Sequence, residues 1–267
     1  MDIISNRLDT FISSEGFGGL NWHDWGPSVC LYHYTNLNHV ESINSNLCCM
    51  NIGRYIQDGE LDCGITFVKT HKSILPKNIV DKVCERITAL RDSLSLPFWT
   101  FSLCRNGNSQ HMWTNYSLKC KGEPCVIAMD GEEIYRQTQN LMEKSLLGGS
   151  QRLYFFLPCF YLPRDGEKVT QLLRFIFSDD YYGSLSMQSH FSNEIQLAVD
   201  LCVMFSLMIK DCEVGTCDYN KEEETRLIVY DNKLGGSAGS VSFGLNKGCV
   251  KCIKHQLLSS FEKYCGE

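Results

Sequence analysis

The apolar pattern of residues 76–103 changes from a helical period to a strand period within a few positions. A helix is predicted behind Pro76, because apolar residues recur there at three-to-four spacing: Ile79, Val80, Val83, Ile87, Leu90 and Leu94. Residues 98–103 then alternate, with Trp99, Phe101 and Leu103 on one side and Thr100 and Ser102 on the other. This alternation predicts a half-buried strand that presents hydroxyl groups.

The other apolar patterns mix strands and helices without a regular strand–helix–strand rhythm. Strands are predicted at residues 29–34, 125–130, 153–161, 224–229 and 240–243. Helices are predicted at residues 4–12, from Asn36 to residue 47, from about residue 193 to 210, and in a final segment carrying Val250, Ile253, Leu257, Phe261 and Tyr264. No linker rich in Pro, Gly and Ser divides the chain. We therefore expect one α+β domain over residues 1–267.

Length and charge narrow the class of protein. A chain of 267 residues with 43% hydrophobic content can bury a sizeable core, so a disordered protein is excluded. The net charge of −6 argues against a general phosphate-tracking surface and excludes a basic nucleic-acid coat protein. A local basic groove stays compatible with this charge.

Cysteine usage and hydropathy predict a cytoplasmic protein with free thiols. The 15 cysteines are odd in number and scattered, and the first residues lack the basic-then-apolar order of a secretory signal. The longest apolar stretch, residues 195–209, is interrupted by Gln196, Asp200 and Ser206. It falls short of a bilayer span of about 20 residues, so we expect a buried helix and no membrane anchor.

Familiar cofactor motifs are missing from the sequence. Neither a Rossmann-type nor a P-loop glycine pattern is present. The most metal-like group is Cys249, Cys252 and His255, but on the predicted final helix these side chains would point in different directions, so no metal site is expected. A thiol redox site at Cys249 and Cys252 is disfavoured because no thioredoxin-like pattern precedes it.

Several separated blocks, covering about two-thirds of the chain, resemble one bacterial family. In the run WTFSLCRNGNSQHMWTNYSLKCKGEPCVIAMD, a strand ending in Phe-Ser is followed by a Met-Trp pair, a Tyr, a Gly and a strand ending in Asp. This run resembles the uncharacterised domain-of-unknown-function family 2971, as do EEETRLIV, which carries Glu222, Glu224 and Arg226, and the closing VSFGLNK. The Asn-Asp-Pro-type motif of such proteins is missing near residues 51–61.

The segment LYHYTNLNHVESI is similar to the opening of ADP-ribosyltransferases of the DarT-like and PARP-like His-Tyr-Glu type. His33 at a strand end, with Thr35 two positions later, fits their spacing. In that superfamily a His comes early in the chain, an aromatic residue or Ser follows in the middle, and a Glu comes late. His33, Ser102 and Glu222 or Glu224 occur in this order. The resemblance implies a split β-sandwich whose cleft between two small sheets binds NAD as co-substrate.

The resemblance also implies roles for these residues. Cleavage of the nicotinamide–ribose bond forms an oxocarbenium-like centre, and Glu224 is expected to stabilise it electrostatically. His33 is expected to hydrogen-bond ribose hydroxyls, and Trp113 or Tyr116 to stack on nicotinamide. Thr35, Ser102 and Glu222 complete the expected cofactor site, with no metal.

The implied biology is that of a toxin or a phage-defence effector. Such an enzyme would transfer ADP-ribose to a macromolecular target, RNA, DNA or protein, and would need a neutralising antitoxin or chaperone. The net negative charge favours a protein target, whereas Lys119 with Lys121, and Lys247 with Lys251 and Lys254, leave a local nucleic-acid path open.

Plainer interpretations stand beside each of these. His33 alone fits a satisfied core histidine, and Glu222, Glu224 and Arg226 alone fit an exposed ion-pair ladder on one strand face. The scattered cysteines fit buried, inert thiols. The alternative function is a non-catalytic nucleotide- or peptide-binding sensor module on the same fold. The two functions differ in whether His33 and Glu224 approach the same cavity.

Overall fold

A computed structural model describes residues 30–45, 48–51, 58–71, 75, 77–93, 97–119, 121–147, 152–176, 192–211, 222–231, 240–242 and 249–254. The architecture is mixed α+β, as the sequence predicts. Contacts divide the chain into two compact units that interleave along the sequence. The first comprises Met1–Asn21, Ile52–Pro97 and Cys159–Cys217, and the second comprises Trp22–Asn51, Phe98–Pro158 and Asp218–Glu267.

The first unit is mainly helical in its described part. It contains α3 (Asp58–Thr70), α4 (Lys77–Ser93), α7 (Gly166–Ile176) and α9 (Ser192–Ser206), with two short parallel strands, β6 (Phe160–Leu162) and β7 (Ile209–Asp211). The predicted helix at 79–94 is confirmed by α4. The apolar stretch at 195–209 is helical only to Ser206, because Met208 N–H donates to the Phe205 carbonyl in a tighter turn before β7 begins.

Among the helices of the described residues, none combines the length and the apolar character needed to cross a bilayer. In α9, residues 199–206 are all buried, including the carboxylate of Asp200. The Nε atom of Arg86 lies 3.6 Å from Asp200 Oδ1. Asp200 lies in the core of the first unit, whereas the Arg86 side chain is 40% exposed.

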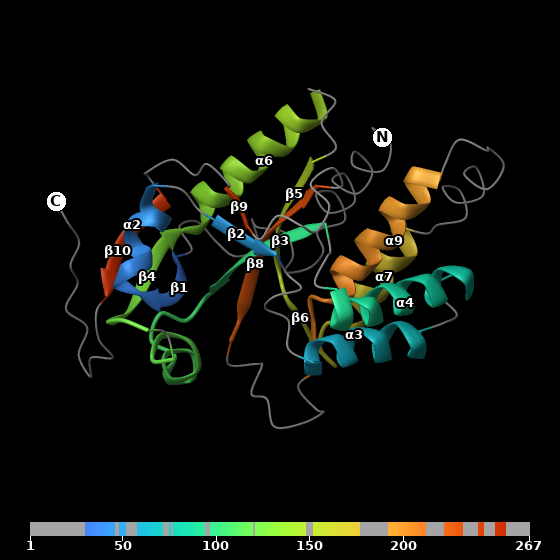
Figure 1. Cartoon of the computed structure of the whole chain (residues 1–267), viewed down its shortest axis with the longest axis horizontal. Coiled ribbons are helices and arrows are strands. Elements are labelled where there is room, and N and C mark those ends of the chain that lie inside the picture. Colours follow the sequence, from blue (N-terminus) through green and yellow to red (C-terminus); the bar gives the residue numbers. More distant parts are fainter. Residues whose placement is uncertain are drawn as a thin grey trace. The chain divides into compact units, whose positions relative to one another are not determined.

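The second unit is built on one antiparallel sheet (Figure 1). Its strands are β1 (Cys30–Asn36), β2 (Cys48–Asn51), β3 (Phe98–Cys104), β4 (Pro124–Asp130), β5 (Arg152–Pro158), β8 (Glu224–Asp231), β9 (Ser240–Ser242) and β10 (Val250–Lys254). The helices of this unit are α2 (Leu37–Ser45), α5 (Gln110–Met112), the π-helix η3 (Trp113–Ser117) and α6 (Gly131–Leu147).

The sheet is nearly divided between β1 and β3. Along its whole length β3 pairs with β8, which pairs in turn with β5. The other edge of β3 meets β1 at one residue pair, Tyr32 with Cys104, and meets β2 at Thr100 and Trp99. The β10–β4–β1 part and the part that contains β3, β8 and β5 are therefore joined directly by a single pair of residues among the described strands. Figure 1 shows α2 beside β1 and β4.

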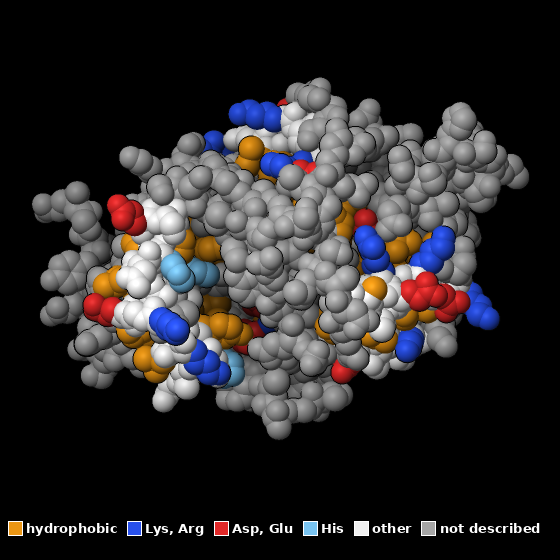
Figure 2. Space-filling model, in the orientation of Figure 1, with side chains coloured by type: hydrophobic (Ala, Val, Ile, Leu, Met, Phe, Trp, Pro, Cys, Tyr) orange, Lys and Arg blue, Asp and Glu red, His pale blue; other side chains and the backbone are white. Residues whose placement is uncertain are grey.

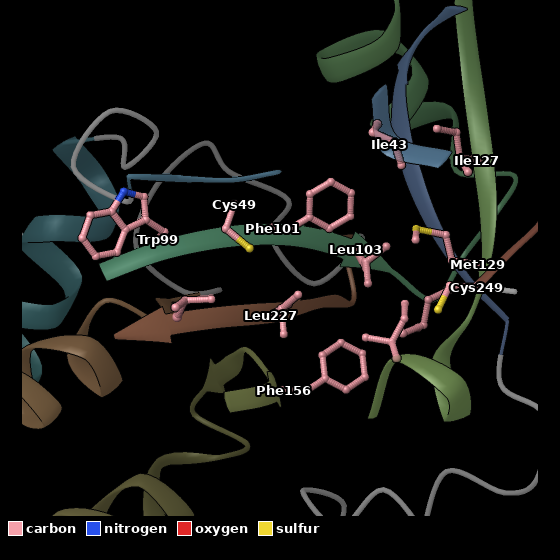
Figure 3. Packing of buried hydrophobic residues seen from close by; sticks show 13 residues of the cluster. Ile43, Cys49, Trp99, Phe101, Leu103, Ile127, Met129, Phe156, Leu227 and Cys249 are labelled. Atoms are coloured by element: carbon pink, nitrogen blue, oxygen red, sulfur yellow. The ribbon is translucent and has the colours of Figure 1, made fainter. Parts of the chain in front are cut away.

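The larger apolar cluster of this unit confirms the apolar face predicted for residues 98–103. The prediction of a half-buried strand is wrong, because Phe98 and Thr100 on the other face are also buried. Trp99, Phe101 and Leu103 all belong to the larger cluster (Figure 3). Leu227 of β8, Phe156 of β5 and Met129 of β4 pack with them, and α2 and α6 cover the cluster with Ile43 and Ile134. Burial of such side chains contributes about 1.5–3 kcal/mol each.

A smaller cluster lies under α5 and η3. It contains Tyr34, Cys104, Met112, Trp113 and Val126. The Tyr34 hydroxyl donates to the Asn106 carbonyl at 2.6 Å and accepts from Ser109 N–H at 3.0 Å, which ties the loop after β3 to β1. Gly107 lies against the Tyr32 ring, where an added Cβ would be 2.3 Å from Cε1. Burial raises the pKa of Cys104 to about 12, so this thiol is inert.

Two further sequence predictions are wrong in this part of the chain. The predicted final helix begins as a strand, because residues 250–254 form β10 and pair with β4; its other predicted residues lie outside the described part. The strand predicted at 153–161 is two strands in two sheets, since β5 ends at Pro158, which has no N–H to continue a ladder, and β6 pairs with β7. The helix predicted at 4–12 also falls outside the described residues.

Candidate functional site

His33 lies where β1 separates from β3. Its Nδ1 is 2.9 Å from the Ser102 carbonyl oxygen, and its ring stacks on Phe101 with centroids 4.2 Å apart. A carbonyl oxygen only accepts, so Nδ1 carries the proton and Nε2 presents a lone pair. Burial, opposed by this hydrogen bond, lowers the pKa of His33 to about 4. At neutral pH the ring is therefore an uncharged acceptor.

The lowered pKa of His33 predicts an acid-sensitive fold. An unfolded His33 takes up a proton near pH 6.5, whereas the folded one stays neutral to about pH 4, so stability is complete above pH 6.5 and is lost as the pH falls. Between pH 7 and pH 4.5 we expect the wild-type protein to lose about 2–3 kcal/mol of unfolding free energy from this group alone. Urea unfolding of His33→Gln should show a smaller loss of unfolding free energy over this pH range, because the contribution of His33 is absent. His71→Gln serves as the control and should lose as much as the wild type. Equal losses in wild type and His33→Gln would contradict the assignment.

Thr35 and Asn36 are buried polar residues that converge on His39 in the first turn of α2. Thr35 Oγ1 lies 3.1 Å from His39 Nδ1, and Asn36 Nδ2 lies 3.5 Å from the same atom. Asn36 Oδ1 accepts the Asn38 N–H at 3.0 Å and so caps the helix. Thr35 and His33 are two positions apart on β1 and therefore share one side of the strand.

Glu222 and Tyr116 are brought together by two unusual backbone features. Tyr116 lies in the π-helix η3, and its hydroxyl donates to Glu222 Oε1 at 2.9 Å. Glu223 has a φ of 43°, which takes Glu222 out of the strand that begins at Glu224. His111 Nε2 is 3.8 Å from the same carboxylate oxygen. Both π-helices and positive φ values at non-glycine residues are enriched at functional sites.

Glu224 is held by Arg226 in a buried, two-bonded ion pair. Arg226 Nε donates to Oε1 at 2.7 Å, and a terminal nitrogen of Arg226 donates to Oε2 at 3.0 Å. The two side chains are 7% and 6% exposed. The interpretation of Glu222, Glu224 and Arg226 as an exposed ladder on one strand face is therefore wrong, since the pair is buried and Glu222 precedes the strand.

The pairing register separates the predicted residues into two groups. Tyr32, Cys104 and Glu224 are successive cross-strand partners and share one face of the sheet. His33 is offset by one position from Tyr32 and stacks on Phe101 of the larger cluster, on the opposite face. The structure thus brings Tyr116 to Glu222 and His33 to the Ser102 carbonyl. It places His33 and Glu224 on opposite faces of the sheet where β1 meets β3.

The two candidate aromatics differ in exposure. Trp113 is 2% exposed and packs edge-on against Tyr34 at 5.8 Å between ring centroids. Tyr116 is 36% exposed. Of the two, Tyr116 has a ring surface that a ligand can contact, and the Ser102 side chain is half-buried on β3.

His39 and His111 were not identified from the sequence, and its spacing placed Arg226 in an exposed ladder and not in a buried pair. Asn36 directly before a helical pattern is a recognisable cap signal, and His39 three residues later is within reach of a capping side chain. Figure 2 shows histidine side chains in pale blue on the surface of the described part, near lysine and arginine. Within the described residues no group of three His, Cys, Asp or Glu side chains is arranged to hold a metal ion.

Comparison with known proteins adds no relative. No protein-family model, no curated protein and no solved structure matches this chain.

Proposed function

We propose that this chain is an NAD-dependent ADP-ribosyltransferase that acts as a toxin or phage-defence effector on a macromolecular target. The observation that carries the proposal is His33, a neutral acceptor fixed on the Ser102 carbonyl where the β10–β4–β1 part of the sheet separates from the part that contains β3. A ribose hydroxyl is a suitable donor for its Nε2 atom. The near division of the sheet is also what a split β-sandwich requires.

The second support is the pairing of a carboxylate with an accessible aromatic ring. Tyr116 has the exposure needed to stack on nicotinamide, and its hydroxyl hydrogen-bonds Glu222. A carboxylate near the nicotinamide ribose stabilises positive charge that develops only in the transition state. The Glu222 carboxylate is the one that accepts a hydrogen bond from the accessible Tyr116, so we assign this electrostatic role to Glu222.

In this proposal the reaction proceeds without a metal. The bond between the nicotinamide nitrogen and ribose C1′ breaks, nicotinamide leaves with the bonding electron pair, and a nucleophile of the target attacks C1′ and loses its proton. The target is RNA, DNA or protein. An antitoxin or chaperone that neutralises the enzyme in its own cytoplasm is a corollary of the proposal.

One observation favours a second candidate function. The carboxylate of Glu224 is engaged by Arg226, and His33 lies on the opposite face at the sheet junction. This arrangement suits a non-catalytic sensor that binds a nucleotide without cleaving it. NAD cleavage distinguishes the two functions.

Calorimetric titration with NAD tests the proposed site. His33→Leu keeps apolar packing on Phe101 but removes the Nε2 acceptor, and we expect at least a tenfold loss of NAD affinity. His71→Gln is the matched control, because His71 also directs Nδ1 to a carbonyl, that of Phe67 at 2.9 Å. Unchanged affinity in His33→Leu would remove His33 from the site.

A further inference from the structure

His111 and Tyr116 reach the same carboxylate oxygen of Glu222 although they lie five residues apart on one helical segment. His111 Nε2 is 3.8 Å from Glu222 Oε1, and the Tyr116 hydroxyl donates to this oxygen at 2.9 Å. In a regular α-helix, residues five apart point about 140° away from each other. Here the segment is wound as a π-helix from Trp113, with the Leu118 N–H bonded to the Trp113 carbonyl. This wider turn brings residues five apart onto one side of the helix.

A chain of polar contacts extends from this carboxylate to the protein surface. Lys119 is exposed, and its Nζ atom, which only donates, bonds Asn115 Oδ1 at 3.1 Å. The amide nitrogen of Asn115 therefore faces His111, where it lies 3.2 Å from Nδ1 and 3.4 Å from Nε2. This NH₂ group also only donates, so Nδ1, the nearer ring atom, is assigned as its acceptor. The ring proton then lies on Nε2, the atom that faces Glu222.

Glu222 is a buried carboxylate beside a strained backbone position. Its side chain is 4% exposed, whereas that of His111 is 23% exposed. The neighbouring Glu223 has a φ of 43°, and its carbonyl accepts the Arg105 N–H at 3.3 Å. Such strain persists only where surrounding contacts fix it, and a buried charge needs polar partners. His111 and Tyr116 provide such contacts from one helical segment.

We propose that His111 is a positioning residue that fixes the Glu222 carboxylate, and that Asn115 and Lys119 hold the His111 ring in the required orientation. A carboxylate stabilises a developing positive charge best when its oxygens are held in place before the reaction. A separation of 3.8 Å exceeds a hydrogen bond, but contacts of this kind often tighten only when the substrate binds. This inference rests on the proposed function, in which Glu222 acts at the nicotinamide ribose.

The tautomer of His111 gives a test that does not depend on enzymatic activity. At pH 8, ¹⁵N chemical shifts of the wild-type imidazole should show a protonated Nε2 and an unprotonated Nδ1. Asn115→Leu keeps the size of the side chain but removes its donor, so both signals should move toward those of mixed tautomers. Thr114→Ala, at an exposed position of η3, is the control and should leave them unchanged. A proton on Nδ1 in the wild type would contradict the assigned chain of contacts.

Kinetics separates a positioning role from substrate binding and from folding. His111→Ala should lower the single-turnover rate of nicotinamide release about 10- to 100-fold, while the dissociation constant of NAD changes by less than about twofold. His111→Gln can still direct an amide N–H toward the carboxylate and should recover part of the rate. Lys119→Met should lower the rate about 2- to 12-fold, the range for one lost hydrogen bond. Lys144→Met removes an exposed lysine of the same unit and is the matched control.

The outcomes separate this inference from the proposed function. All variants are compared at a temperature at which circular dichroism shows them folded. If Glu222→Gln loses turnover but His111→Ala is as fast as Thr114→Ala, the positioning role is wrong and the proposed function stands. Equal losses of NAD affinity and rate in His111→Ala would also overturn it, because they indicate substrate binding. A wild-type protein that releases no nicotinamide would reject both. A slower reaction at unchanged NAD affinity, with partial recovery in His111→Gln, is the result that a positioning role predicts.

Discussion

Glu224→Gln should destabilise the protein by about 3–5 kcal/mol, which is a large share of the stability of a single domain. The substitution keeps the shape of the side chain but removes the negative charge that faces the Arg226 guanidinium. Arg226 is 6% exposed and bonds both carboxylate oxygens, so the variant removes the charge of the carboxylate to which this buried cation is bonded. Urea unfolding followed by circular dichroism measures the loss.

Two further variants make this prediction specific to the ion pair. Glu224→Leu combined with Arg226→Met removes both charges and should recover most of the lost stability, because apolar pairs of similar volume often replace buried ion pairs without cost. Glu123→Gln, at an exposed position of the same unit, should change stability by less than about 0.5 kcal/mol. A loss below about 1 kcal/mol in Glu224→Gln would show that the pair behaves like a surface salt bridge.

Glu222→Gln is expected to lower NAD-dependent turnover by roughly 10²-fold or more, the scale for loss of one preorganised electrostatic stabiliser. Gln still accepts the hydrogen bond from Tyr116, so the fold should be less affected than by Glu224→Gln. Nicotinamide release under single-turnover conditions, at a temperature where every variant is fully folded, gives the comparison. This expectation differs from the sequence analysis, in which the Glu-x-Glu spacing assigns the catalytic carboxylate to Glu224.

Tyr116 supplies the control for the carboxylate. Tyr116→Phe removes the hydroxyl bound to Glu222 but keeps the ring, so turnover should fall less than in Glu222→Gln, while Tyr116→Ala should also weaken NAD binding. Full turnover in Glu222→Gln with loss in Glu224→Gln, measured on folded protein, would transfer the role back to Glu224.

The parts of the fold that the sequence predicted are those with an unambiguous period. The alternation of Trp99, Phe101 and Leu103 gave the buried face of β3, and the three-to-four spacing behind Pro76 gave α4. Residues 250–254 were wrongly predicted as helical because Val250 and Ile253 also fit helical spacing. In a short apolar run the pairing partner, here β4, decides between the two structures.

The site was harder to predict because its geometry depends on local backbone conformation and long-range register. Period-two spacing predicts that Glu222 shares a strand face with Glu224, but the positive φ of Glu223 breaks that period. A Glu-Glu-Glu run carries no glycine that would indicate such a φ value. The separation of His33 and Glu224 follows from the single pairing of Tyr32 with Cys104, which local patterns do not specify. His39 became recognisable only through the hydrogen bonds of Thr35 and Asn36.

Nicotinamide release by the purified protein tests the central claim most directly. The protein is incubated with NAD labelled in the adenosine half, together with total cell lysate, and free nicotinamide and label on RNA, DNA and protein are quantified. An NAD-dependent ADP-ribosyltransferase releases nicotinamide and transfers the label to one class of macromolecule, and Glu222→Gln loses both signals. Saturable NAD binding with no nicotinamide release would contradict the enzymatic account and identify the chain as a nucleotide-binding module.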